Sequence, residues 1–102
     1  MNAISISDAR RFSLAAVQRN VLAELPGLTL EVLGFEAGQT LDTAALERPC
    51  AYQVLEGEAL VRHDGAVVRL GKGKVLPVPA GTEHALENAG GGLLVILATH
   101  GG

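Results

Sequence analysis

The sequence predicts an all-β fold. Thirteen glycines and four prolines divide the 102 residues into short apolar runs, a spacing typical of a β-sandwich or barrel. Between two such runs lies Asp64-Gly65, a type I′ hairpin signal, because both residues tolerate positive φ. Apolar residues make up 48% of the chain and charged residues 19%, which favours a folded globule over disorder.

The first 35 residues are the hardest to assign. Asn2–Ile6 alternates weakly and predicts an edge strand. Ser7 or Asp8 is expected to cap a short helical turn that runs through Arg11.

Val17–Leu25 fits two structures. Its apolar residues at 17, 21, 22 and 25 lie on one helical stripe, but Pro26-Gly27 follows as a strong turn signal. Leu28–Phe35 is then apolar enough for a buried strand. We favour strand–turn–strand, because a barrel needs a strand at this place.

The second half of the chain reads as strands joined by tight turns. Gly71–Gly73 and Pro79-Ala80-Gly81 are predicted turns, and Gly90–Gly92 a loop. The predicted strands are Ala51–Leu55, Glu58–His63, Ala66–Leu70, Lys74–Val78, His84–Glu87 and Leu93–Thr99.

One spaced motif stands out between Gly73 and Asn88. It consists of Gly73, five residues, Pro79, one residue, Gly81, two residues, His84, three residues and Asn88. The two glycines permit backbone angles closed to other residues, and Pro79 favours the turn between them. This spacing resembles the second signature motif of the cupin family at every defined position.

The resemblance extends over most of the chain. Tyr52–Gly57, followed by the hairpin at Asp64-Gly65, is similar to the middle region of cupins, so the likeness covers residues 28–99. It implies one cupin domain over residues 1–102, a double-stranded β-helix or jelly-roll barrel of six to eleven strands. Residues 1–27 would add N-terminal strands and the short helical turn.

The family's first motif lacks its metal ligands here. With Gly38 and Gly57 as anchors, the two histidine positions fall on Ala44 and Leu46, and the glutamate position falls on Cys50. His84 is then the only family ligand position that is retained. A divalent metal site needs three or four converging donors, so we expect no metal and no other cofactor. An unusual site built on Cys50 and His84 is the remaining metal-binding alternative.

Strand periodicity predicts which side chains face the barrel interior. If Cys50 points inward, Tyr52 does too, because side chains alternate with a period of two. The predicted pocket is mostly apolar, and its lining is Ala44, Leu46, Cys50, Tyr52, His84 and Leu86. There Tyr52 and His84 would orient a polar group of a ligand, or would fill a packed barrel as a hydrogen-bonded pair.

Three functions are compatible with these residues. The first is a metal-free cupin that binds a small molecule as a binding or accessory module rather than an enzyme. The second is a metal-independent isomerase or epimerase with His84 as base and Tyr52 as acid, although the carboxylate that supports such a histidine in similar proteins is not identifiable. The third is a metal-dependent oxygenase or isomerase with a non-standard site.

The other residues with reactive or polar side chains are expected to have structural roles or to lie in solvent. Cys50 could be a nucleophile if its pKa were lowered, but a lone buried cysteine usually behaves as a small hydrophobe. His63 is expected to be solvated beside its hairpin turn, and His100 to lie in a frayed C-terminal tail. Asn88 is expected to stabilise its turn through hydrogen bonds to the backbone.

Composition and charge limit the kinds of partner that the chain is expected to bind. The net charge is −3, aromatics make up 3%, and no basic cluster stands out beyond Arg10-Arg11, which argues against nucleic acid. The apolar runs are too short for a membrane span, and no signal peptide is visible, so a cytoplasmic location is expected. Leu93–Ala98 is apolar on both faces, which predicts that a second copy covers the outer face in a homodimer.

Overall fold

The computed structural model describes residues 1–101 and confirms the all-β prediction. The described residues form one short 3₁₀ turn and nine strands. Their bounds are η1 (Ile6–Ala9), β1 (Gln18–Leu25), β2 (Leu28–Phe35), β3 (Thr40–Thr43), β4 (Cys50–Glu56), β5 (Glu58–His63), β6 (Ala66–Gly71), β7 (Val75–Val78), β8 (His84–Asn88) and β9 (Leu94–Gly101). In residues 1–101 there is no helix long and apolar enough to cross a membrane.

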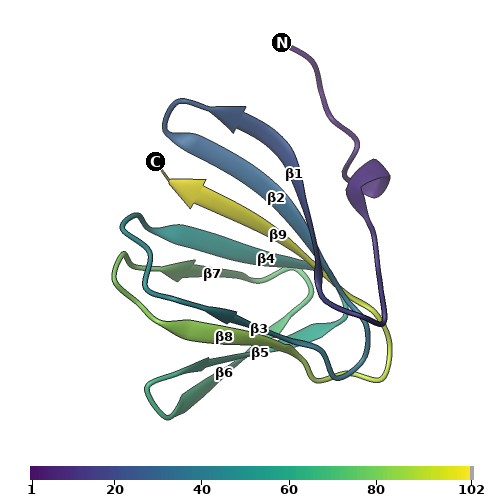
Figure 1. The fold of residues 1–102 in the computed structure, drawn as a ribbon, viewed down its shortest axis with the longest axis vertical. Coiled ribbons are helices and arrows are strands. Elements are labelled where there is room, and N and C mark those ends of the chain that lie inside the picture. Colours follow the sequence, from purple (N-terminus) through teal and green to yellow (C-terminus); the bar gives the residue numbers. More distant parts are fainter. Residues whose placement is uncertain (102) are drawn as a thin grey trace.

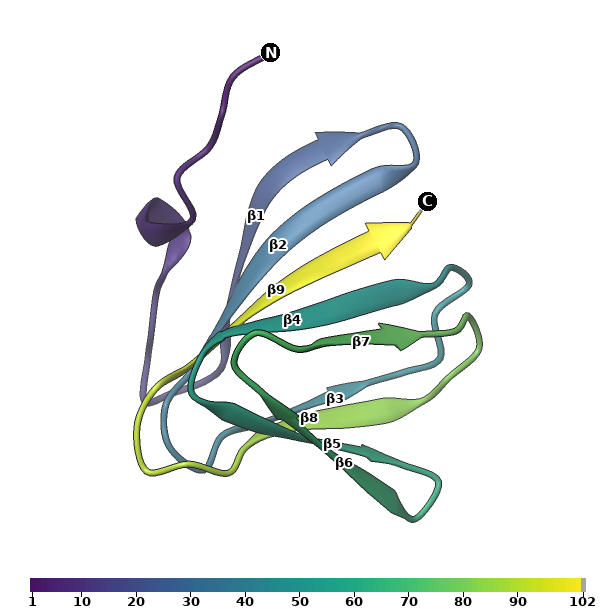
Figure 2. The same ribbon diagram turned by 180° about the vertical axis from the view of Figure 1, so that it is seen from behind.

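The strands form two antiparallel sheets that face each other (Figures 1 and 2). The first sheet has the order β1-β2-β9-β4-β7, and the second has the order β3-β8-β5-β6. Strands β7 and β6 are therefore edge strands of different sheets. The turns β1–β2 and β5–β6, the loops β3–β4 and β7–β8, and the end of β9 lie at one end of the barrel, which we call the mouth (Figure 1).

Most of the strand predictions are confirmed. The strand favoured for Val17–Leu25 is confirmed as β1 (Gln18–Leu25), which pairs with β2 on both sides of an irregularity between Val21 and Ala23. Asp64 and Gly65 have φ values of 49° and 79°, as the predicted type I′ hairpin requires. The short strand β3 was not expected, because its sequence TLDT carries only a brief alternation.

The N-terminal predictions hold only in part. A short helical turn is present, but it begins at Ile6, and Ser5 precedes it without a side-chain capping hydrogen bond, so capping by Ser7 or Asp8 is wrong. The predicted edge strand Asn2–Ile6 is also wrong, because residues 1–5 belong to no strand. Ile6 instead packs into an apolar cluster on the outside of the first sheet.

This outer cluster shows what covers the second apolar face of β9. Ala9, Val32 and Val95 form its buried centre, and Ile6 and Phe12 pack against them from the N-terminal segment. That segment runs outside β1 and β2 (Figures 1 and 2). The chain's own N-terminus therefore supplies part of the cover that the sequence argument assigned to a partner subunit.

Gly34 makes this close approach possible. A Cβ atom at Gly34 would lie 1.9 Å from the backbone oxygen of Arg11, which is far inside van der Waals contact. Any larger residue at position 34 would therefore push the N-terminal segment away from the sheet.

Candidate functional site

The predicted inward face of β4 is confirmed. Cys50, Tyr52 and Val54 alternate with more exposed neighbours along the strand and belong to the central core cluster. On the second sheet, His84 and Leu86 of β8 are buried on the same interior side, with 5% and 0% of their surfaces exposed. Two strands from different sheets thus direct Tyr52 and His84 into one interior.

Tyr52 and His84 form a hydrogen-bonded pair. The Tyr52 hydroxyl lies 2.7 Å from Nε2 of His84, and the two rings meet edge to face with centroids 5.5 Å apart. On the other side of the imidazole, Nδ1 lies 2.9 Å from the backbone carbonyl of Thr82. Both ring nitrogens of His84 therefore have a partner inside the protein.

These contacts fix the tautomer of the neutral imidazole. A carbonyl oxygen can only accept, so Nδ1 of His84 carries the proton and donates it to Thr82. Nε2 of the neutral ring then has only a lone pair, and it accepts the proton of the Tyr52 hydroxyl. The isomerase hypothesis requires a carboxylate behind His84, but the backbone carbonyl of Thr82 occupies that position instead.

Burial controls the acidity of the two residues beside this histidine. Burial raises the pKa of Tyr52, and hydrogen bonding with Cys50 raises it further, while Thr43 lowers it only in part. Burial also raises the pKa of the Cys50 thiol, against a smaller opposing effect of the Tyr52 hydroxyl. At neutral pH both groups keep their protons, which disfavours Cys50 as a thiolate nucleophile.

An apolar pocket of about 170 Å³ opens beside His84 between the edge strands β6 and β7. Most of its walls are aliphatic, and the polar part is confined to two histidines and a threonine near the mouth. The lining residues are Val61, His63, Ala66, Val68, Leu76, Pro77, Val78, Pro79, Thr82 and His84. We call this the β6–β7 pocket.

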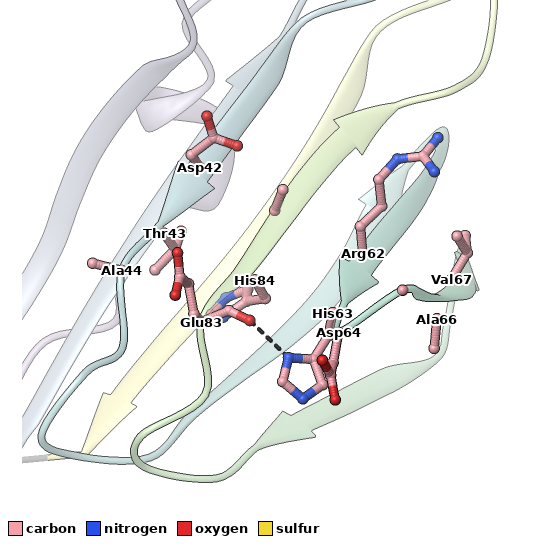
Figure 3. Close-up of a pocket in the computed structure, with 12 residues that line it drawn as sticks. Asp42, Thr43, Ala44, Arg62, His63, Asp64, Ala66, Val67, Glu83 and His84 are labelled. Carbon is pink, nitrogen blue, oxygen red and sulfur yellow. Dashed lines mark hydrogen bonds between the residues drawn. The ribbon is translucent and has the colours of Figure 1, made fainter.

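A larger and more open cavity of about 840 Å³ lies near the outer surface of the second sheet (Figure 3). Asp42 and Arg62 both pair in register with Ala85, so these three side chains share the face opposite to His84. At its lower end His63 donates a hydrogen bond from Nδ1 to the carbonyl of Glu83, at 2.7 Å. His63 is exposed, as expected, but its ring is held by this bond.

The six residues predicted to line one pocket lie in different surroundings. Ala44 and His84 both line the outer cavity, and Leu46 borders a separate cavity at the mouth. Cys50, Tyr52 and Leu86 lie in the core cluster. The backbone N–H of Gly81 donates to the carbonyl of Leu46, at 2.8 Å, which ties the β3–β4 loop to the β7–β8 loop.

Sequence reasoning missed a second polar cluster on the inner face of the first sheet. Glu31 is 5% exposed, and its carboxylate accepts hydrogen bonds from Arg19 (Nη2, 2.6 Å; Nε, 3.4 Å) and from Nε2 of His100 (2.8 Å). The prediction that His100 lies in a frayed tail is wrong, because β9 continues through His100 and pairs with β2 and β4.

A signal for this cluster was present in the sequence. Glu31 is the lone carboxylate in an apolar strand, and period-two alternation places it on the same face as Leu33 and Phe35. A buried carboxylate needs charged or hydrogen-bonding partners, and Arg19 lies on the preceding strand of the same hairpin.

Asn88 has the structural role that the sequence predicted. Its Nδ2 donates to the carbonyl of Gly92 at 2.8 Å and lies 3.1 and 3.3 Å from the carbonyls of Glu36 and Phe35. Its Oδ1 accepts from the N–H of Gly90 at 3.1 Å. The last residue of the motif therefore fastens the loop before β9 to the end of β2.

The donors around His84 do not fit the metal site that the family resemblance implies. Nε2 of His84 is occupied by the Tyr52 hydroxyl, and Nδ1 by a carbonyl. Ala44 and Leu46 offer no donor atoms in their side chains, and the Cys50 thiol is protonated. Within residues 1–101, no group of three His, Cys, Asp or Glu side chains converges as a metal site would require.

Comparison with known proteins agrees with this architecture. Residues 51–100 match the family model of the cupin domain. A crystal structure of an RmlC-like cupin protein from Desulfovibrio desulfuricans is 27% identical, with a TM-score of 0.87 over 99% of this chain and 96% of that chain. No curated protein matches the chain in sequence.

Two further crystal structures share the fold at lower identity. An uncharacterized conserved protein with a double-stranded β-helix domain from Klebsiella pneumoniae has a TM-score of 0.92 at 20% identity, over 99% of this chain and 90% of that one. The protein TT1209 from Thermus thermophilus has a TM-score of 0.90 at 19% identity, over 99% and 97%. With the motif around His84, the two-sheet barrel and the family match, the chain is a member of the cupin superfamily.

Proposed function

We propose that this cupin is a metal-free binding module, and that its site is the β6–β7 pocket. The observation that carries the proposal is His84, a buried histidine with both nitrogens paired inside the protein, beside a pocket with aliphatic walls. A histidine in this state is a poor metal ligand, because a metal would have to displace the Tyr52 hydroxyl from Nε2.

The pocket favours a compact and largely apolar ligand. Its volume of about 170 Å³ is close to that of an engineered apolar cavity of about 150 Å³ that binds benzene. Val61, Val68 and Leu76 would bury the body of the ligand, and each Å² of apolar surface removed from water contributes about 25 cal/mol. The imidazole of His84 would contact it at the inner end.

This geometry supports binding better than proton transfer. An epimerase would need Nε2 of His84 free to take a proton from its substrate, whereas here Nε2 already accepts one from Tyr52. Tyr52 is in the core, 2% exposed, and burial raises the pKa of its hydroxyl. We therefore propose a binding or accessory module rather than an enzyme.

Benzene and phenol are suitable probes, and two neighbouring valines provide a matched pair of variants. Val68 lines the β6–β7 pocket, while Val67 lines the outer cavity. Val68→Phe should fill the pocket, and Val67→Phe adds the same bulk outside it. We expect saturable NMR shift changes with benzene or phenol in the wild type and in Val67→Phe, and none in Val68→Phe.

Two results would overturn the proposal. One is the absence of saturable binding of both probes to the wild-type protein. The other is equal binding to the wild type and to Val68→Phe, which would place the probe elsewhere. The predicted homodimer is a separate proposal, which light scattering coupled to gel filtration would test.

A further inference from the structure

A third cavity, of about 380 Å³, lies at the mouth on the inner side of the first sheet. Its floor comes from three neighbouring strands, with Arg19 on β1, Glu31 on β2 and His100 on β9. Its rim comes from the β3–β4 loop, where Leu46, Glu47 and Arg48 border it. We call it the mouth cavity; its volume lies within the roughly 300–1,000 Å³ of ordinary small-molecule sites.

The buried carboxylate of Glu31 orients the imidazole of His100. Arg19 donates to both oxygens of Glu31, and this pairing keeps the carboxylate ionised in spite of its burial. An ionised carboxylate only accepts, so Nε2 of His100 must carry the proton in their 2.8 Å bond. In the neutral ring, Nδ1 is therefore the nitrogen with an available lone pair.

That second nitrogen has no hydrogen-bond partner among residues 1–101. The side chain of His100 is 22% exposed and borders the mouth cavity. In the neutral ring, Nδ1 can therefore accept a hydrogen bond from a bound molecule. This differs from His84, whose two nitrogens are both used inside the protein.

The charges around the cavity are of both signs. The side chain of Arg19 is half exposed, and its guanidinium has N–H groups beyond those used on Glu31. Arg48 and Glu47 form no ion pair with any residue in 1–101, and both border the cavity. One rim thus offers guanidinium donors, a carboxylate acceptor and the apolar side chain of Leu46.

We propose that the mouth cavity binds a free α-amino acid with an aliphatic side chain. Its carboxylate pairs with Arg48 and with the remaining N–H groups of Arg19. Its ammonium donates to Nδ1 of His100 and pairs with Glu47. Its side chain lies against Leu46. The site is separate from the β6–β7 pocket and goes beyond the function proposed for that pocket.

Three probes that share the isobutyl side chain of leucine test the proposal. L-leucine has both charged groups, 4-methylpentanoate lacks the ammonium, and 3-methylbutylamine lacks the carboxylate. We expect leucine to bind at least about tenfold more tightly than either analogue, a difference that corresponds to about 1.4 kcal/mol. Binding should also shift the ring signals of His100 in NMR spectra.

Arg48→Gln and Arg69→Gln are the matched variants, since both remove an exposed arginine and only Arg48 borders the cavity. Arg48→Gln should weaken leucine binding about tenfold, while Arg69→Gln and Val68→Phe should leave it unchanged. No binding of leucine, equal binding of 4-methylpentanoate, or equal loss in both arginine variants would each overturn the proposal. Because Val68→Phe affects only the β6–β7 pocket, failure of one site is distinguishable from failure of the other.

Discussion

The barrel interior contains two clusters of buried polar side chains, one around His84 and one around Glu31, and they differ in how their polar atoms are paired. Tyr52 and His84 are paired as neutral side chains, with each proton assigned to a partner inside the protein. Glu31 is buried as a charge, and Arg19 and His100 supply the donors that stabilise it. A histidine with both nitrogens paired inside the protein has no lone pair left for a ligand, whereas a histidine with a carboxylate on one nitrogen keeps the other nitrogen available.

The largest effect is expected from removal of the buried charge. Glu31→Gln replaces an acceptor of three hydrogen bonds with an amide, whose NH₂ group faces the donors of Arg19 and His100. We expect the free energy of unfolding to fall by about 2–3 kcal/mol at pH 7, since hydrogen bonds to charged groups are involved. Urea denaturation measures it, and a loss below that of Glu87→Gln would contradict the account.

The same variant has a signature in its pH dependence. Burial raises the pKa of Glu31, but the hydrogen bonds from Arg19 and His100 more than offset this, so its pKa lies below the ordinary value of 4.5. A carboxylate with a lowered pKa adds stability above its unfolded pKa, and this stability is lost as the pH falls through the folded pKa. The stability difference between wild type and Glu31→Gln should therefore shrink below pH 4.5.

A smaller effect is expected for the neutral pair. Tyr52→Phe removes the hydroxyl and leaves Nε2 of His84 buried without a donor, which should cost about 1–2 kcal/mol. In the double variant Tyr52→Phe/His84→Leu, the Nε2 atom that Tyr52→Phe leaves unpaired is itself removed, so the cost of the double variant should be less than the sum of the two single variants. Additive costs in this double-mutant cycle would show that the two side chains do not interact.

The smallest effect is expected for an exposed ion pair. Arg62 and Glu87 are 3.3 Å apart, and half of the Arg62 side chain is in solvent. Glu87→Gln should change the free energy of unfolding by about 0–1 kcal/mol, because solvent screens the pair. A loss as large as that of Glu31→Gln would mean that burial does not distinguish the two carboxylates.

The sequence predicts the barrel well because its signals are local. Period-two alternation places Cys50 and Tyr52 inward, and the spaced motif places His84 at the start of a strand. The hydrogen bond between Tyr52 and His84 depends on how two sheets face each other, which no local pattern specifies. The path of the N-terminal segment over Gly34 is equally non-local.

His100 is a clearer case in which local sequence patterns did not predict a non-local contact. Two glycines follow it, a composition typical of a loose end, yet pairing of β9 with β2 and β4 holds it in the sheet. Glu31 could have been recognised as an inward carboxylate from alternation alone. Its partnership with His100, 69 residues away in the sequence, required the sheet order.

The protonation of His84 tests the central claim most directly. Long-range ¹H–¹⁵N NMR spectra distinguish a protonated ring nitrogen from one with a lone pair. At neutral pH we expect the His84 proton on Nδ1, an accepting Nε2, and unchanged ring signals when Zn²⁺ or Fe²⁺ is added. A proton on Nε2, or a stoichiometric change of the His84 signals on addition of either metal, would contradict the account.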